Sequence, residues 1–166
     1  MIIRRGALAD LPDVQRLNQE LFQHEHDAQF YDDESYNLNW PYEEGGIKYF
    51  TECLGENPTA ALFLAVDEGR AVGYLAASFY NRTYRSHNPV GYLDNMYVDP
   101  EHRSAGVGTA LIDAFKTWAK DNQVLIVRVS AMARNHRAQS FYRKNGFTDR
   151  EVTLEQSIRP AEHDAG

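Results

Sequence analysis

The sequence predicts a single mixed α/β domain. Its 166 residues match the length of one ordinary domain, and a composition that is 43% hydrophobic and 25% charged favours a globular chain with a buried core. Strand-like segments follow one another in the middle of the chain, which favours antiparallel hairpins. Strand and helix patterns then alternate, as they do in strand–helix–strand units. We expect the domain to span residues 1–158 and a flexible tail to follow at 159–166.

The first part of the chain predicts a short strand, a helix and a long loop. Residues 2–4 have the composition of a strand, and Asp10 stands at an N-cap position with Pro12 just inside the first turn. Apolar residues then recur at helical spacing, which predicts a helix over 11–23. Residues 24–44 lose this period, and a loop of that length in a small domain is typically functional or mobile.

A second helix is predicted over 46–54, and three strands follow it. An almost continuous apolar run at 60–66 and a strand-like segment at 71–80 are separated by Asp-Glu-Gly-Arg at 67–70. This tetrapeptide is a tight-turn signal, so the two strands are expected to form a hairpin. The next strand is predicted over 90–98 and ends where an Asp-Pro pair follows.

The last part of the chain alternates helix and strand. The patterns predict a helix over 106–121, a strand over 124–130 and a helix over 136–145, which ends at an Asn-Gly pair. Residues 147–154 are predicted to form a final strand.

Composition and charge exclude several classes of protein. The formal net charge of −7 argues against the basic surface that nucleic-acid binding needs. No apolar run approaches the ~20 residues that span a bilayer, and the N-terminus lacks an apolar signal core, so we expect a cytoplasmic protein with no membrane partner. Cys53 is the only cysteine and has no Cys/His cluster around it, so neither a disulfide nor a metal site is expected.

The charged residues are unevenly distributed along the chain. Residues 25–44 hold seven acidic side chains and no Lys or Arg, together with several aromatic residues, whereas residues 128–150 hold six Lys or Arg residues and one acidic residue. The first segment suits a cation and the second an anion. Either segment is equally consistent with an ordinary solvated surface.

The strongest chemical signal is a glycine-containing loop at 98–109, between a predicted strand and a predicted helix. The free backbone N–H groups of a helix N-terminus and its dipole favour a pyrophosphate. Gly106 and Gly108 lack a Cβ, which allows phosphates to approach closely, and Arg103 adds positive charge. The loop has neither the Gly-Lys-Ser/Thr of a Walker motif nor the three-glycine dinucleotide fingerprint. Taken alone, it is also compatible with a simple turn into a helix.

Two segments together resemble the GNAT (GCN5-related N-acetyltransferase) superfamily. Residues 103–108 read RSAGVG and match its pyrophosphate loop, Arg/Gln-x-x-Gly-x-Gly/Ala, after a strand that ends in MYVDP. Residues 135–147 read NHRAQSFYRKNGF and resemble its second hallmark, Asn-x-x-Ala-x-x-Phe-Tyr-x-x-x-Gly-Phe. The resemblance covers residues 2–154 and is most specific over 93–147.

The resemblance implies an acyl-CoA N-acyltransferase fold. In this fold a central twisted, mostly antiparallel sheet has parallel middle strands, here 90–98 and 124–130, that splay apart, and helices flank the sheet. Acetyl-CoA is the implied co-substrate, with its pantetheine arm against the backbone of Met96 and Val98. The amine is expected to attack the thioester directly, without an acyl-enzyme. The pyrophosphate is expected on the backbone amides of Arg103, Ser104, Ala105, Gly106, Val107, Gly108 and Thr109.

The resemblance also implies roles for three side chains. Tyr142 corresponds to a tyrosine near the sulfur and is expected to be the general acid, and a core aromatic is the alternative. Asp94 stands where relatives often carry glutamate, and burial would raise its pKa toward that of a base acting directly or through a water. A structural carboxylate bonded to the backbone is the alternative for Asp94. Asn135 is expected to contact pantetheine, to cap a helix, or both.

The expected acceptor is a small cationic amine such as a polyamine or an aminoglycoside. An alternative within the same chemistry is a protein N-terminus or lysine side chain. An alternative of another class, a non-catalytic acyl-CoA-binding sensor or interaction module, would need neither Tyr142 nor Asp94. The family resemblance also makes a homodimer an expected state. The acidic, aromatic loop is expected to bind the acceptor through Asp32, Asp33, Glu34 and Trp40.

Overall fold

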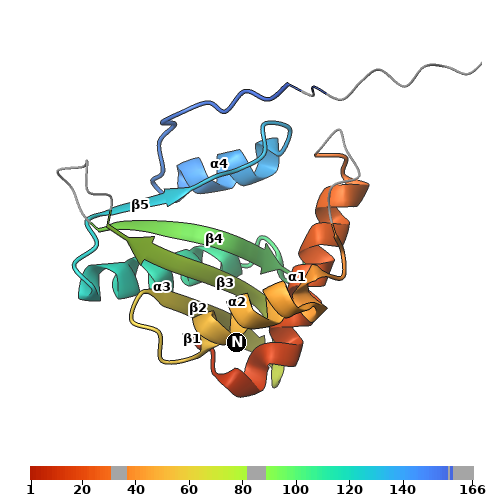
Figure 1. The fold of residues 1–166 in the computed structure, drawn as a ribbon, viewed down its shortest axis with the longest axis vertical. Coiled ribbons are helices and arrows are strands. Elements are labelled where there is room, and N and C mark those ends of the chain that lie inside the picture. Colours follow the sequence, from red (N-terminus) through yellow and green to blue (C-terminus); the bar gives the residue numbers. More distant parts are fainter. Residues whose placement is uncertain (31–36, 82–88, 157, 159–166) are drawn as a thin grey trace, which may run out of the picture.

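The computed structural model describes residues 1–30, 37–81, 89–156 and 158. In this part of the chain a five-stranded sheet has helices on both faces (Figure 1). The strands are β1 (Ile2–Arg5), β2 (Ala60–Asp67), β3 (Arg70–Tyr80), β4 (Val90–Val98) and β5 (Ile126–Val129). The helices are α1 (Leu11–Asp27), α2 (Glu44–Leu54), α3 (Val107–Asp121) and α4 (His136–Lys144). None of the helices in these ranges is long and apolar enough to cross a membrane.

The strands follow one another across the sheet in the order β1-β2-β3-β4-β5. The first four are antiparallel neighbours, whereas β4 and β5 are parallel. The β2–β3 hairpin turns through Glu68 at φ 48° and Gly69 at φ 81°, the pair of positive φ angles that a tight two-residue hairpin turn requires. The structure therefore confirms both the mixed α/β sheet and the predicted hairpin.

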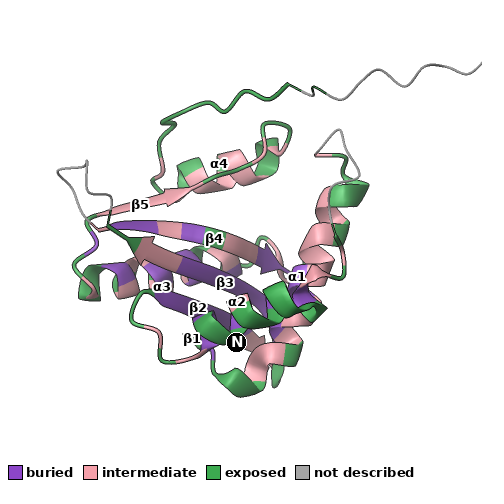
Figure 2. Ribbon diagram, viewed as in Figure 1, coloured by how far each residue is buried: buried purple, intermediate pink, exposed green. Residues whose placement is uncertain are grey.

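Two apolar cores lie on opposite faces of the sheet, and β2 contributes to both. Ala61, Phe63 and Ala65 pack into the core that contains α3. The alternate residues Leu62 and Leu64 pack into the core that contains α1 and α2. Because both faces are covered, the strand is apolar from residue 60 to residue 66, which explains the continuous run seen in the sequence. Figure 2 shows the buried residues concentrated in β2 and β3.

Helix α1 is longer than the sequence predicts. It ends at Asp27 rather than at residue 23. Its last turn holds His24, Glu25 and His26 in place of apolar residues, so the apolar period stops before the helix does. The added turn brings charged side chains to the C-terminal end of α1.

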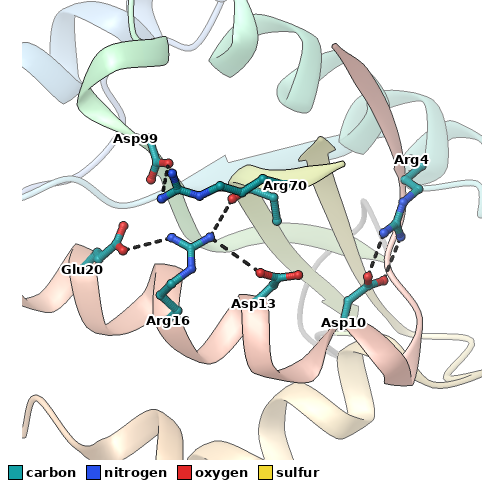
Figure 3. Close-up of polar contacts among 8 residues, drawn as sticks. Arg4, Asp10, Asp13, Arg16, Glu20, Arg70 and Asp99 are labelled. Carbon is teal, nitrogen blue, oxygen red and sulfur yellow. Dashed lines mark hydrogen bonds and ion pairs between the residues drawn. The ribbon is translucent and has the colours of Figure 1, made fainter. Parts of the chain in front are cut away.

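A hydrogen bond attaches α1 to the sheet, and an ion pair links β3 to the residue that follows β4 (Figure 3). Arg16 donates to the Ala71 carbonyl at 2.6 Å and to Glu20 at 2.9 Å. Arg70 lies 3.6 Å from the carboxylate of Asp99, the residue that follows β4. Burial and the nearby charge of Glu20 raise the pKa of Asp99. Arg16 and Glu20 of α1 thus lie near the start of β3 and near Asp99.

Asp10 lies at the N-terminus of α1, as predicted, but its side chain does not cap that helix. It accepts a hydrogen bond from the Ala7 N–H at 2.8 Å and forms a bidentate pair with Arg4, with both distances at 2.7 Å (Figure 3). The Arg4 guanidinium holds the pKa of Asp10 below its usual range. Asp10 therefore stabilises the turn between β1 and α1.

The predicted final strand over 147–154 is wrong. Residues 147–156 form no strand, and Val152 and Leu154 are 85% and 90% exposed. A strand pattern becomes a strand only beside a partner, and β5 pairs with β4 alone among the described residues. The tail predicted at 159–166 lies outside the described residues.

Candidate functional site

Strands β4 and β5 pair over only part of their length. Strand β5 is shorter than the predicted 124–130, and its pairing with β4 runs from Val90 opposite Ile126 to Leu93 opposite Val129. Beyond Leu93, β4 continues beside β3 only, within the part of the chain that the structure describes. The outer edge of residues 94–98 therefore leaves backbone groups for a ligand that extends the sheet. The parallel pairing expected of these two strands is confirmed, and β5 lies at the edge of the described sheet rather than in its middle.

Asp94 lies at a β-bulge where this opening begins. The pairing of β3 with β4 passes from Ala77 opposite Leu93 to Ala76 opposite Asn95, which leaves Asp94 as the extra residue of β4. A bulge bends its strand and redirects the side chain. Asp94 is accordingly exposed, although its neighbour Leu93 is buried.

Neighbouring side chains orient the Asp94 carboxylate. The Tyr49 hydroxyl donates a long hydrogen bond to Asp94 Oδ2 at 3.4 Å and accepts one from Asn95 Nδ2 at 3.3 Å. Crowding by the surrounding protein raises the pKa of Asp94, and hydrogen bonds with Ser78 and Tyr49 offset part of this shift. A carboxylate with a raised pKa that solvent still reaches is suited to accept a proton. Because Tyr49 belongs to α2, Asp94 lies on the face of the sheet that α1 and α2 cover.

Trp40, which the sequence predicts as a substrate contact, lies in an aromatic cluster on the same face. Its ring centroid is 5.8 Å from that of Tyr49, 5.8 Å from that of Phe50 and 6.1 Å from that of Phe22. It is half-buried, so it packs α1 against α2 and keeps part of its surface accessible. The other predicted acceptor contacts lie outside the described residues: Asp32, Asp33 and Glu34.

The loop after β4 turns sharply into α3. Ser104 has φ 66°, and Gly106, at the N-cap of α3, has φ 81°. A Cβ on Gly106 would meet nothing within 4 Å, so backbone conformation rather than space favours glycine there. Ser104 and Ala105 are exposed, while Val107 is buried and anchors the helix in the core. The exposed start of α3 is suited to an anion such as a pyrophosphate.

Gly108 has a structural reason that the sequence does not show. A Cβ at this position would lie 2.9 Å from Phe141 Cζ and 3.0 Å from Met96 Cε. Helix α3, helix α4 and the open part of β4 therefore meet at this glycine. Close packing, and not only access for phosphates, explains glycine at this position of the motif.

Arg103 and Asn135 each stabilise the element that carries them. Arg103 Nε donates to the Val98 carbonyl at 2.8 Å, and its guanidinium lies 5.4 Å from the centre of the Tyr97 ring. This anchors a positive charge at the start of the loop. The Ala138 N–H donates to Asn135 Oδ1 at 2.9 Å, which confirms the predicted helix cap.

Tyr142 lies on α4 with its ring half-buried. Its ring centroid is 5.4 Å from that of Phe141 and 5.7 Å from that of Phe147. Burial, and to a lesser degree the negative charge of Glu25, raises the pKa of Tyr142 to about 12. The hydroxyl therefore keeps its proton at neutral pH, as a general acid must.

Sequence reasoning does not single out every residue of this site. Nothing in the helix pattern around Tyr49 indicates a contact with Asp94, and Glu25 is only one of several acids in an acidic segment. Among the described residues, no three His, Cys, Asp or Glu side chains gather in a way that could hold a metal ion.

A comparison with protein families identifies the chain. The family model described as the acetyltransferase (GNAT) family matches residues 14–147, which include the loop after β4 and all of α4. The chain belongs to the GNAT acetyltransferase family. It is accordingly an N-acetyltransferase that takes its acyl group from a coenzyme A thioester.

Similar proteins include acetyltransferases of aminoglycosides. An aminoglycoside N(6')-acetyltransferase type 1 from Stenotrophomonas maltophilia is 27% identical over 128 residues, which cover 74% of this chain and 82% of that protein. The protein of the same name from Acinetobacter haemolyticus is 34% identical over 99 residues, which cover 57% and 67%.

Solved structures of such enzymes share the fold. The aminoglycoside 6'-N-acetyltransferase AAC(6')-IG from Acinetobacter haemolyticus superposes with a TM-score of 0.71 at 25% identity, covering 96% of this chain and 99% of that chain. AAC(6')-Iy, in complex with a bisubstrate analogue of coenzyme A and acetylneamine, also superposes with a TM-score of 0.71, at 20% identity over 96% and 98% of the two chains.

Proposed function

We propose that this GNAT protein transfers an acetyl group from acetyl-CoA to a primary amine of a small cationic molecule, by direct attack in a ternary complex. The observation that carries the proposal is the open edge of β4 at residues 94–98. This edge begins at the exposed carboxylate of Asp94 and leads to the glycine N-cap of α3. Residues 94–108 thus supply, one after another along the chain, a candidate base, an open strand edge and a site for an anion.

The residues of the chain fit the parts of acetyl-CoA. The backbone edge at Met96 and Val98 is suited to the amides of pantetheine, although Arg103 already donates to the Val98 carbonyl. The amides from Arg103 to Thr109 at the start of α3 are suited to the pyrophosphate. The side-chain oxygen of Asn135, Oδ1, accepts the hydrogen bond of the helix cap from the Ala138 N–H. Its side-chain Nδ2 is therefore the group that suits pantetheine.

In the proposed reaction Asp94 takes a proton from the acceptor ammonium, directly or through a water. The amine nitrogen then forms its bond to the acetyl carbon, the carbon–sulfur bond breaks, and the nitrogen loses its second proton to solvent, which leaves a neutral amide. Asp94 returns its own proton to solvent. Tyr142 gives its proton to the departing sulfur and regains one from solvent. The raised pKa of Asp94 makes its carboxylate a stronger base, and the raised pKa of Tyr142 keeps its phenol protonated, so both shifts support the proposed roles.

The proposed acceptor resembles an aminoglycoside or a polyamine. The names of the relatives support this class, and the aromatic cluster around Trp40 lies beside Asp94, where it suits an ammonium group. A thiol-release assay separates the alternatives. Turnover of peptide amines alone would favour a protein acetyltransferase, and acetyl-CoA binding without turnover of any amine would favour a sensor.

Gly106→Asp is expected to weaken acetyl-CoA binding about tenfold or more, whereas Gly106→Asn should bind nearly as tightly as the wild type. The two side chains have the same size and both tolerate the φ of 81°, so the variants differ mainly in charge. A carboxylate at this helix N-terminus repels the pyrophosphate. Isothermal titration with acetyl-CoA measures the difference. Equal affinities of the two variants, or no binding by the wild type, would contradict the proposed function.

We also propose that the protein forms a homodimer. The outer edge of β5 is unpaired within the described residues, and Val152, Leu154 and Ile158 are 85%, 90% and 92% exposed. Addition of strands between two copies would cover both features. Sedimentation at micromolar concentration should give the mass of two chains. A monomer at every concentration would contradict this proposal without affecting the catalytic one.

A further inference from the structure

Glu25 lies on the face of α1 that is turned toward the sheet. It follows Asn18 by seven residues, about two helical turns, so the two side chains share one face. Asn18 is fully buried, and its Nδ2 donates to the Tyr74 hydroxyl of β3 at 2.8 Å. Glu25 is half-buried. Its carboxylate is therefore on the sheet side of α1, near the C-terminal end of the helix.

This end of α1 lies beside the start of α4. Arg134, just before the N-cap of α4, donates to the Gln29 carbonyl at 3.4 Å, and Gln29 directly follows the end of α1 (Figure 1). Burial and the positive charges of Arg103 and Arg137 lower the pKa of His24, so the neighbour of Glu25 lies among groups of the glycine loop and of α4. The end of α1 thus forms one side of the candidate site.

Glu25 also lies within electrostatic reach of the proposed acid. Its negative charge contributes to the raised pKa values of Tyr74 on β3 and Tyr142 on α4. Both phenols stay protonated at neutral pH. Glu25 therefore brings a negative charge toward the reacting centre from α1.

Asp94 and Glu25 reach the site from different elements on one face of the sheet. Asp94 contacts Tyr49 of α2, whereas Glu25 belongs to α1. The rings of Trp40, Tyr49 and Phe22 pack between these two helices. An acceptor that approaches Asp94 from this face meets aromatic rings and a second carboxylate, which together suit a second ammonium group.

We propose that Glu25 binds a second cationic group of the acceptor while the reacting amine lies at Asp94. This inference rests on the proposed function and narrows the acceptor to molecules that carry at least two amino groups. The contact does not involve the reacting atoms, so it strengthens acceptor binding rather than the bond-making step. Glu25 is in this sense a residue that determines specificity.

The test compares Glu25→Gln with wild type on two acceptors: tobramycin, an aminoglycoside with several amines, and 6-amino-6-deoxyglucose, which has one. The variant is expected to raise KM for tobramycin about tenfold or more, because a charge-assisted contact is lost. Its kcat, and its KM for the single-amine sugar, should stay within about twofold. Glu25→Asp keeps the charge on a shorter side chain and should recover part of the affinity for tobramycin.

Asp27→Asn is the matched control. It removes the same charge from the same helix end, where Asp27 is exposed and bonded to Gln23 and His26. Its effect on either acceptor should not exceed about twofold, because an exposed charge is screened. An equal rise of KM in both variants would mean that Glu25 acts only through net charge. A fall of kcat for both acceptors would make it a partner of Tyr142. Either result overturns the proposal.

The proposal can fail separately from the proposed function. If the wild type acetylates neither acceptor, an aminoglycoside acceptor is ruled out, and calorimetry of tobramycin binding to protein saturated with coenzyme A still tests Glu25. Weaker binding by Glu25→Gln supports the contact, and equal binding overturns it. An acetyl-CoA affinity equal to that of the wild type shows that the variant is folded.

Discussion

Asp94→Asn is expected to lower kcat by about 10²- to 10⁴-fold, because asparagine cannot take the proton of the acceptor ammonium. The substitution preserves the size of the side chain and an oxygen for the Tyr49 hydrogen bond, so the bulge in β4 should persist. Acetyl-CoA affinity should therefore be unchanged. Steady-state kinetics at saturating acetyl-CoA, with calorimetry on the same samples, separate the loss of chemistry from a loss of binding.

The pH profile gives an independent check on Asp94. Because the pKa of this carboxyl is raised above 3.8, wild-type kcat/KM should rise with pH through that higher value. This acidic limb should be missing from the residual activity of Asp94→Asn.

The raised pKa of Asp94 also makes the stability of the protein depend on pH, because the folded state holds the Asp94 proton more tightly than the unfolded state. Ionisation therefore costs stability, and the cost is absent below the unfolded pKa and grows as pH rises through the folded pKa. Asparagine does not ionise and avoids this cost. The free energy of unfolding of Asp94→Asn minus that of the wild type should therefore be larger at neutral pH than at about pH 3.

Tyr49→Phe distinguishes orientation of the base from proton transfer by it. This variant keeps Asp94 but removes the hydroxyl that donates to Oδ2. We expect kcat to fall by only about two- to tenfold and the acidic limb to remain. If Asp94→Asn instead keeps full kcat, Asp94 is a structural carboxylate of the bulge, and the base must be another group on the same face.

Elements that depend on near neighbours in the chain are predictable from the sequence, and those that depend on distant partners are not. The β2–β3 hairpin follows from two apolar runs and the turn residues between them, and α3 follows from its own apolar spacing. The segment 147–154 has a strand-like pattern too, but no neighbour in the described sheet pairs with it. Its pattern alone therefore gives the wrong result.

The same distinction holds for the site. The motif residues at the start of α3 and on α4 occupy the predicted elements, because each motif is local. The bulge at Asp94 depends on the register between β3 and β4, and the packing of Gly108 depends on Phe141. The position of Glu25 depends on how α1 crosses the sheet. Each of these joins residues that are far apart in the sequence, so no spacing rule reports them.

Tyr142→Phe is expected to lower kcat by about 10²-fold or more, because the departing thiolate loses its proton donor. Phenylalanine keeps the ring that packs against Phe141 and Phe147, so α4 and the acetyl-CoA affinity should be preserved. The raised pKa of about 12 also predicts that deprotonation of Tyr142 does not limit the wild-type rate between about pH 7 and pH 10. Rapid-quench measurement of the first turnover reports the chemical step without product release.

Tyr42→Phe is the matched control for this variant, since it removes a phenol hydroxyl from an exposed residue whose hydrogen-bond partner is Gln19. Its kcat should equal that of the wild type. The comparison matters because the half-buried Tyr142 ring has a packing role as well as a chemical one. If Tyr142→Phe kept full kcat with unchanged acetyl-CoA affinity, only the packing role would remain. The proton for the sulfur would then have to come from solvent, which also reaches Asp94 in the opening beside β4.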